Sequence, residues 1–82
     1  MAQQKRKTRE PFGIVDIGAT KLACFISERN AENQITLLGQ SVHAADGIKN
    51  GDISDLEKFR TALGRTIELA EQDAGVEIKI ID

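Results

Sequence analysis

The chain has 82 residues, of which 40% are hydrophobic and 29% are charged, a balance typical of one small soluble domain and too apolar for a disordered chain. Its formal charge of −2 gives no reason to expect nucleic acid or anionic lipid as a partner. The apolar runs fall short of the roughly 18 residues of a membrane span. A single cysteine excludes an internal disulfide framework and fits a cytoplasmic protein.

Residues 1–11 form a polar, basic stretch that ends at Pro11. It lacks the apolar segment of a secretory signal, and short charged termini are usually solvated. We therefore expect a disordered basic arm over 1–11 and a folded part over 12–82.

Three apolar segments follow the arm. The sequence FGIVDI (12–17) is apolar at both odd and even positions, which predicts a strand covered on both faces. The segment 21–28 predicts a second strand, and the short link between the two predicts an antiparallel hairpin. After a polar turn at 29–34, the segment 35–42 predicts a third strand. The expected element is a three-stranded antiparallel meander.

A polar loop over 43–52 leads to a predicted helix. Ser54 and Glu57 have the spacing of a capping box, Gly64 suggests a close backbone approach, and Gly75 predicts the end of the helix. The apolar positions recur every three or four residues, as a buried helix face requires: they are Leu56, Phe59, Leu63, Ile67 and Ala70.

The segment 76–82 alternates apolar and polar residues and predicts a fourth strand. A strand reached through a helix lies parallel to its partner by a right-handed crossover, and we expect that partner to be the first strand. The predicted fold class is therefore α/β. Because the helix can cover only one face of the sheet, we expect part of the core layer to be absent.

The link between the first two strands contains the candidate site. Gly18, Ala19 and Thr20 are small enough to let a phosphate approach backbone N–H groups. Thr20 adds a hydroxyl donor, Lys21 adds a cation, and Asp16 could hold a hydrated Mg²⁺. The alternative from the residues alone is that Gly18 only forms a turn and Asp16 only caps it.

The stretch GIVDIGATKLACFI resembles the first phosphate-binding hairpin of the actin, Hsp70 and sugar-kinase ATPase superfamily. The segment after it resembles FtsA, the family of bacterial actin-like cell-division proteins, in a pattern formed by Gly47, Ile48, Gly51, Ile53 and Asp55. The resemblance covers about residues 12–82. It implies a partial actin-like (ribonuclease H-like) subdomain, the N-terminal part of the first lobe.

The resemblance implies a protein that binds ATP and Mg²⁺ between two lobes, polymerises with itself and tethers the FtsZ ring to the cytoplasmic face of the cell membrane during septum formation. Asp16, Gly18, Ala19, Thr20 and Lys21 match the first phosphate motif, with Asp16 nearest the metal. The family's second phosphate motif, adenosine motif, FtsZ-binding lobe and membrane helix have no counterpart in this sequence. Whether ATP is hydrolysed is left open.

Two alternatives remain at this point. DIGATK is close to the Asp-Ile-Gly-Gly-Thr-Lys motif of ROK-type sugar kinases, although Ala19 replaces the second glycine and the loop GIKNGDISDL differs. The chain could also be a non-catalytic interaction module that offers a strand edge, 35–42 or 76–82, to a partner.

Other polar residues need no special role. His43 has no second ligand at metal-binding spacing, and Cys24 is expected to pack as a small hydrophobe. Lys49 is expected to be a solvated loop residue, while Asp52 and Asp55 complement the helix dipole.

Overall fold

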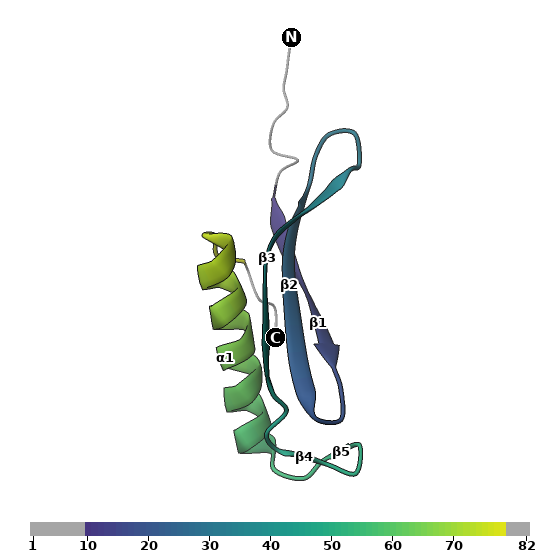
Figure 1. Ribbon diagram of the computed structural model, residues 1–82, viewed down its shortest axis with the longest axis vertical. Helices are drawn as coiled ribbons and strands as arrows, with labels where there is room; N and C mark the ends of the chain where they lie inside the picture. Colours follow the sequence, from purple (N-terminus) through teal and green to yellow (C-terminus); the bar gives the residue numbers. More distant parts are fainter. Residues whose placement is uncertain (1–9, 79–82) are drawn as a thin grey trace.

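The computed structural model describes residues 10–78 and contains a three-stranded antiparallel sheet in the order β1-β2-β3 (Figure 1). The strands are β1 (Pro11–Ile17), β2 (Lys21–Arg29) and β3 (Ile35–Ala44). The predicted meander is confirmed. Pro11, which was assigned to the arm, is instead the first residue of β1, a position where proline is tolerated because an edge strand needs no N–H donor there. Residues 1–9 of the predicted arm lie outside the described residues.

The prediction of a loop over 43–52 is wrong at both ends. β3 continues through Ala44, and the short strands β4 (Ile48–Lys49) and β5 (Asp52–Ile53) pair as a small hairpin. Its turn is Asn50-Gly51, with φ of 53° and 82°, and Asn-Gly is the sequence that favours a tight hairpin turn with both residues at positive φ. This hairpin brings the chain to the start of the helix.

The helix α1 (Leu56–Ala74) has Asp55 as its N-cap, and not the predicted Ser54. The Lys58 backbone N–H donates to Asp55 Oδ1 at 3.1 Å, whereas Ser54 Oγ donates to the Gly47 carbonyl at 3.2 Å. The capping-box prediction is therefore wrong, because the serine hydroxyl is already used. The predicted end is confirmed: Gly75 has φ of 77° and its N–H donates to the Glu71 carbonyl at 2.8 Å.

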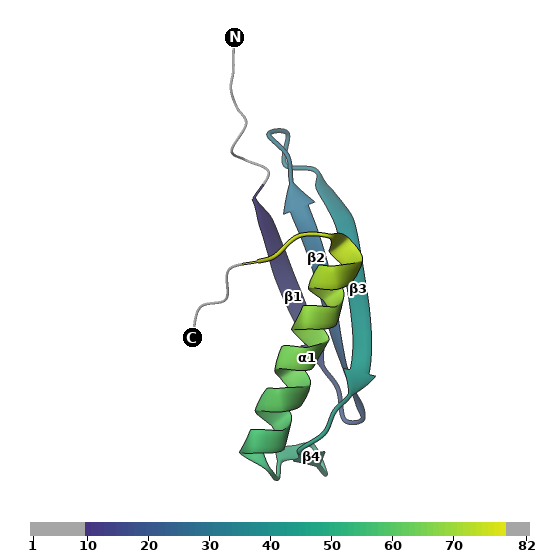
Figure 2. The same ribbon diagram turned by 90° about the vertical axis from the view of Figure 1, so that its left-hand side faces the viewer.

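One face of the sheet packs against α1 (Figure 2), mainly along β2 and β3. The buried residues form two clusters: Leu22, Ala45, Phe59 and Ala62, and then Cys24, Ile26 and Ala70. Leu56, predicted in the buried stripe, is 58% exposed. Thr66, not predicted there, is fully buried, and its hydroxyl is satisfied because Oγ1 donates to the Ala62 carbonyl at 2.7 Å.

The close backbone approach predicted at Gly64 lies instead at Gly39. A Cβ on Gly39 would lie 2.4 Å from the backbone nitrogen of Ala74, while nothing lies within 4 Å of a Cβ on Gly64. Gly39 therefore lets β3 come against the last turn of α1.

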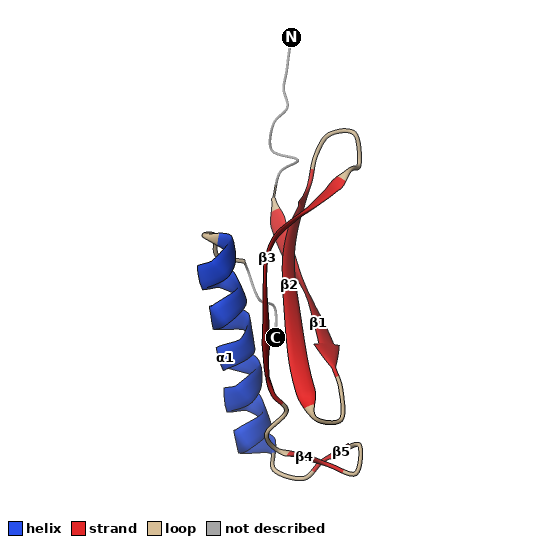
Figure 3. Cartoon of the chain, viewed as in Figure 1, coloured by secondary structure: helices blue, strands red, loops and turns tan. Residues whose placement is uncertain are grey.

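The other face of the sheet has no layer over it among the described residues, and Figure 3 shows the helix on one side only. Ile14 is 55% exposed, so the prediction that both faces of the first strand are covered is wrong for this part of the chain. We call this surface the open face. Its exposed large apolar residues, placed there by the strand register, are Ile14, Ile35, Leu37 and Val42.

After the helix, residues 76–78 are not in a strand, and 79–82 lie outside the described residues. The Ile78 N–H donates to Glu71 Oε2 at 2.9 Å. A Cβ on Gly13 would lie 2.6 Å from Ile78 Cδ1, so the chain reaches β1 at this point. The predicted fourth strand parallel to β1 stays a prediction.

Candidate functional site

The turn between β1 and β2 contains the residues singled out in the sequence. Ile17 and Leu22 form the last pair of the hairpin, and the Gly18 N–H donates to the Lys21 carbonyl at 2.9 Å. A Cβ on Gly18 would lie 3.1 Å from that carbonyl oxygen. Ala19 and Thr20 form the exposed tip. The absence of a side chain at Gly18 thus allows its backbone to lie close to the Lys21 carbonyl across the hairpin.

Two backbone donors at this tip are available to a ligand. Within residues 10–78, the N–H groups of Ala19 and Thr20 have no hydrogen-bond partner. The Thr20 carbonyl accepts from the Ala45 N–H at 2.9 Å, which fixes the turn against the end of β3. Successive N–H groups held in a turn make an anion-binding concavity.

Asp16 and Lys21 flank this tip on the same side of the sheet. Asp16 pairs with Ala23 across the hairpin, and Lys21 is two residues before Ala23 on β2, so the two side chains are diagonal neighbours with Cα atoms about 7–8 Å apart. Both are exposed, and neither forms an ion pair in the part of the chain that the structure describes. The register therefore places a carboxylate and an ammonium group beside two free N–H donors.

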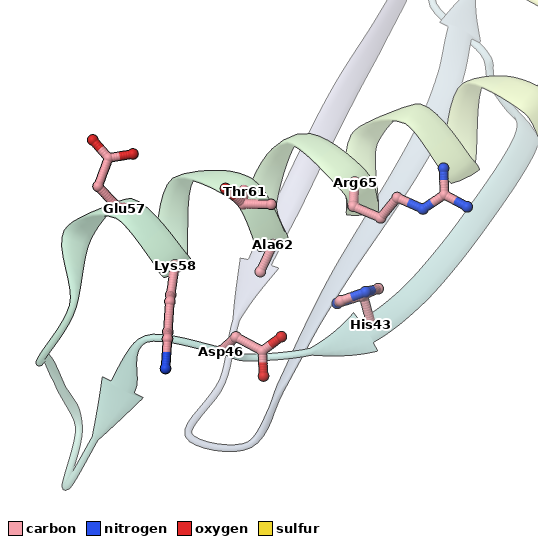
Figure 4. Close-up of a pocket in the computed structure, with 7 residues that line it drawn as sticks. All are labelled: His43, Asp46, Glu57, Lys58, Thr61, Ala62 and Arg65. Carbon is pink, nitrogen blue, oxygen red and sulfur yellow. The ribbon is translucent and has the colours of Figure 1, made fainter.

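A separate groove of about 660 Å³ lies beside the first half of α1 (Figure 4). His43 and Asp46 lie along one wall, and Lys58, Thr61 and Arg65 project from the helix. His43 Nδ1 lies 2.9 Å from the Ala44 carbonyl and so donates to it. Cations and carboxylates are mixed along this groove, so its charge does not select an anion as the turn does.

The described residues contain no group of three His, Cys, Asp or Glu side chains suited to a metal ion. Asp16 is the carboxylate that the hairpin register places beside the turn. Mg²⁺ is commonly held by one or two carboxylates together with substrate phosphates and water, so this donor set fits a metal that arrives with a phosphate ligand.

Cys24 lies in the core between β1 and β3 and is fully buried. Burial, and secondarily the Glu71 carboxylate, raise the pKa of its thiol above the ordinary value of 9.0. This confirms the prediction of a packing role, because a nucleophilic cysteine needs a lowered pKa.

No family model matches the chain. The chain is similar to several curated proteins that carry the name cell division protein FtsA. The chain is 31% identical to that of Pseudomonas aeruginosa over 78% of its own length, and 33% identical to that of Streptococcus pneumoniae over 87%. The Staphylococcus epidermidis protein is 35% identical over 79%. The chain is related to a part of FtsA.

That part is small, since the chain spans only 14–15% of the length of these three FtsA relatives. The sheet and helix are compatible with a partial actin-like subdomain. The matches do not favour the sugar-kinase alternative.

The structure places the residues predicted for the site together at the β1–β2 turn. The Thr20–Ala45 hydrogen bond and the groove were not predicted. Both depend on the backbone path of residues 43–52, which was predicted as loop. The Asn50-Gly51 pair was the signal that could have revealed the hairpin there.

The described helix, α1, does not have the length of apolar sequence needed to cross a lipid bilayer.

Proposed function

We propose that the chain provides the first phosphate-binding turn of an FtsA-like, ATP-binding protein of bacterial cell division. The observation that carries the proposal is the pair of unpartnered N–H groups at Ala19 and Thr20, flanked by Asp16 and Lys21. Similarity to FtsA over most of the chain supports it.

In this proposal each residue of the turn has its own part in holding Mg²⁺-ATP, whose metal supplies charge neutralisation at the phosphates. The Ala19 and Thr20 N–H groups and the Thr20 hydroxyl donate to phosphate oxygens, and the Lys21 ammonium balances their charge. Asp16 holds the metal through water. Gly18 keeps the two strands close enough for these donors to converge.

The wider role that we propose follows from the family resemblance. An FtsA-like protein containing this turn would assemble with copies of itself and tether the FtsZ ring to the cytoplasmic face of the cell membrane, where the septum forms. The matched relatives' name supports a cell-division role. Tethering of the FtsZ ring is a more specific proposal and needs its own test.

A chimera tests both parts. Residues 11–78 replace the aligned segment of Pseudomonas aeruginosa FtsA, and Mg²⁺-ATP binding is measured by calorimetry. Asp16→Ala is expected to weaken binding at least about tenfold, the effect of losing about 1.4 kcal/mol at the metal. Lys49→Ala, an exposed change on β4, is the control and should leave affinity unchanged.

Equal affinity for the chimera and its Asp16→Ala variant would contradict the assignment of the turn. The division role is tested by whether the chimera supports septum formation in cells depleted of their own FtsA. A chimera that binds ATP but leaves cells filamentous would refute the tethering role alone.

A further inference from the structure

The outer edge of β3 is a surface that the phosphate turn and the groove leave unexplained. β3 is last in the sheet order β1-β2-β3, so one side of the strand pairs with β2, and within residues 10–78 no strand lies beside the other (Figure 2). Such an edge offers unpaired N–H and C=O groups to a further strand, including the same strand of a second copy. Its tendency to pair depends on which of those groups are free.

Hydrogen bonds fix which residues of β3 direct their backbone groups outward. The Ala45 N–H donates at 2.9 Å to the carbonyl of Thr20, the residue before β2, so the backbone at Ala45 points toward β2. The direction alternates along an antiparallel strand. A register shift between Ile26 and Ser27 of β2 ends the regular pairing. In the regular part of β3 the outward residues are therefore Gln40, Val42 and Ala44.

Two of these outward groups are already bonded to side chains. The Gln40 N–H donates to Asp73 Oδ2 at 3.0 Å, which agrees with its outward direction. The Ala44 carbonyl accepts from His43 Nδ1 at 2.9 Å. The N–H groups of Val42 and Ala44 have no partner among the described residues. The outward edge is thus capped at its two ends and open between them.

The position of Asp73 is not explained by the helix itself. Asp73 lies in the last turn of α1, where a negative charge opposes the helix dipole, and aspartate is a weak helix former. It reaches Gln40 because Gly39 lets the last turn of the helix come close: a Cβ on Gly39 would lie 2.4 Å from the Ala74 nitrogen. The strand and the helix are therefore arranged so that a carboxylate covers a backbone donor of the edge.

The two capped groups would be partners of one another in a symmetric dimer. If β3 of a second copy paired antiparallel with Val42 opposite Val42, Gln40 would lie opposite Ala44 at both ends of the pairing. Each of these ends needs the Gln40 N–H of one copy to donate to the Ala44 carbonyl of the other. Asp73 occupies the donor of that bond, and His43 occupies its acceptor.

We propose that the outer edge of β3 is a surface for pairing with a second copy of this chain, and that Asp73 and His43 keep it closed. The two caps are unequal, because a carbonyl oxygen can accept two hydrogen bonds whereas the single N–H is already used. Asp73 therefore withdraws the donor, and His43 only crowds the acceptor. The inference does not rest on nucleotide binding or on a role in cell division.

Disulfide trapping in the 82-residue chain tests the pairing and its register. Opposed residues of a hydrogen-bonded antiparallel pair have Cα atoms about 5.5 Å apart, a separation that a disulfide spans, so Val42→Cys reports the paired edge. Leu37→Cys is the matched control on the same strand and the open face, at 53% exposure against 61% for Val42. In the proposed register the two copies of residue 37 lie about 30 Å apart.

Cross-linking under mild oxidation is followed on non-reducing gels, and we expect it to be slow for Val42→Cys when both caps are present. Asp73→Ala should raise the rate at least about tenfold, because it restores one hydrogen bond at each end of the dimer. Asp73→Asn should leave the rate unchanged, since its amide oxygen can still accept from Gln40. His43→Ala alone should change the rate less than about twofold, but it should increase the effect of Asp73→Ala.

The fold of each variant is checked through Cys24, which is fully buried and should stay unreactive toward a maleimide. Asp73→Ala should keep the fold, because alanine is the better helix former. If Cys24 nevertheless reacts, Asp73→Lys takes its place, since it also lacks an acceptor and its charge favours the end of a helix. The same tenfold increase is then required of it.

Three results would overturn the proposal. One is fast cross-linking of Val42→Cys with both caps intact. Another is an unchanged rate in a folded variant that lacks the Asp73 carboxylate. The third is equal acceleration of Val42→Cys and Leu37→Cys, because association through another surface would not follow the register of β3.

Discussion

The two faces of the sheet carry similarly apolar side chains but differ in how exposed these side chains are to solvent. On the face toward α1, Leu22, Cys24 and Ile26 are completely buried. On the open face, Ile14 and Val42 are 55% and 61% exposed, although they are as apolar as the buried set. An apolar strand pattern therefore tells which residues can be buried, and the neighbouring layer decides which of them are.

The comparison is tested most strongly by truncating one side chain on each face. Ile26→Ala should destabilise the chain by about 3–4 kcal/mol, because it removes a fully buried side chain and leaves a cavity. Val42→Ala, on the open face, should cost less than about 0.5 kcal/mol. Urea unfolding followed by circular dichroism measures both, and equal losses would show that the open face is covered in the lone chain.

A pair of glycines sharpens the same contrast on the helix side. Gly39→Ala should cost about 3 kcal/mol, because its Cβ would lie 2.4 Å from the Ala74 nitrogen. Gly64→Ala adds a methyl where nothing lies within 4 Å and should stabilise the helix by about 1 kcal/mol. The same urea unfolding experiment measures both changes in stability. A stabilising Gly39→Ala would mean that α1 does not pack closely against β3.

The smallest expected effect is a pH dependence of folding stability, which arises from Cys24 on the face that α1 covers. Burial raises the pKa of Cys24 above 9.0, so the thiol ionises first in the unfolded chain. Its contribution to stability is full below pH 9 and is lost as the pH rises toward the folded pKa, by at most about 1.4 kcal/mol per pH unit. Stability measured from pH 8 to 10 should fall more steeply in the wild type than in Cys24→Ala, and parallel curves would contradict this.

Local patterns predicted the elements well because they depend on neighbours in the chain. The existence of β1, β2, β3 and α1 follows from the apolar spacing, and the end of the helix follows from Gly75. The start of the helix was misassigned because Ser54 and Asp55 both satisfy the cap pattern, and the Gly47 carbonyl, seven residues before Ser54, decides between them. Leu56 was misplaced because periodicity finds an apolar stripe but not where the sheet beneath it ends.

The side chains of the candidate site could be predicted from the sequence, but its free backbone N–H donors could not. Asp16, Thr20 and Lys21 could be named from the motif alone. Which N–H groups remain free depends on the Gly18–Lys21 hydrogen bond, and the position of Asp16 relative to Lys21 depends on the register. Both are properties of the folded hairpin.

The hydrogen bond from the Ala45 N–H to the Thr20 carbonyl gives the turn a mechanical connection to the rest of the chain. Ala45 lies two residues before Gly47, whose carbonyl accepts from both Ser54 and Asp55 at the start of α1. These hydrogen bonds connect the tip, through a short stretch of backbone, to the first turn of the helix. The Ala45 amide proton is consequently a natural spectroscopic reporter: its exchange rate and chemical shift register the state of the tip from a position that no ligand at the tip would need to touch.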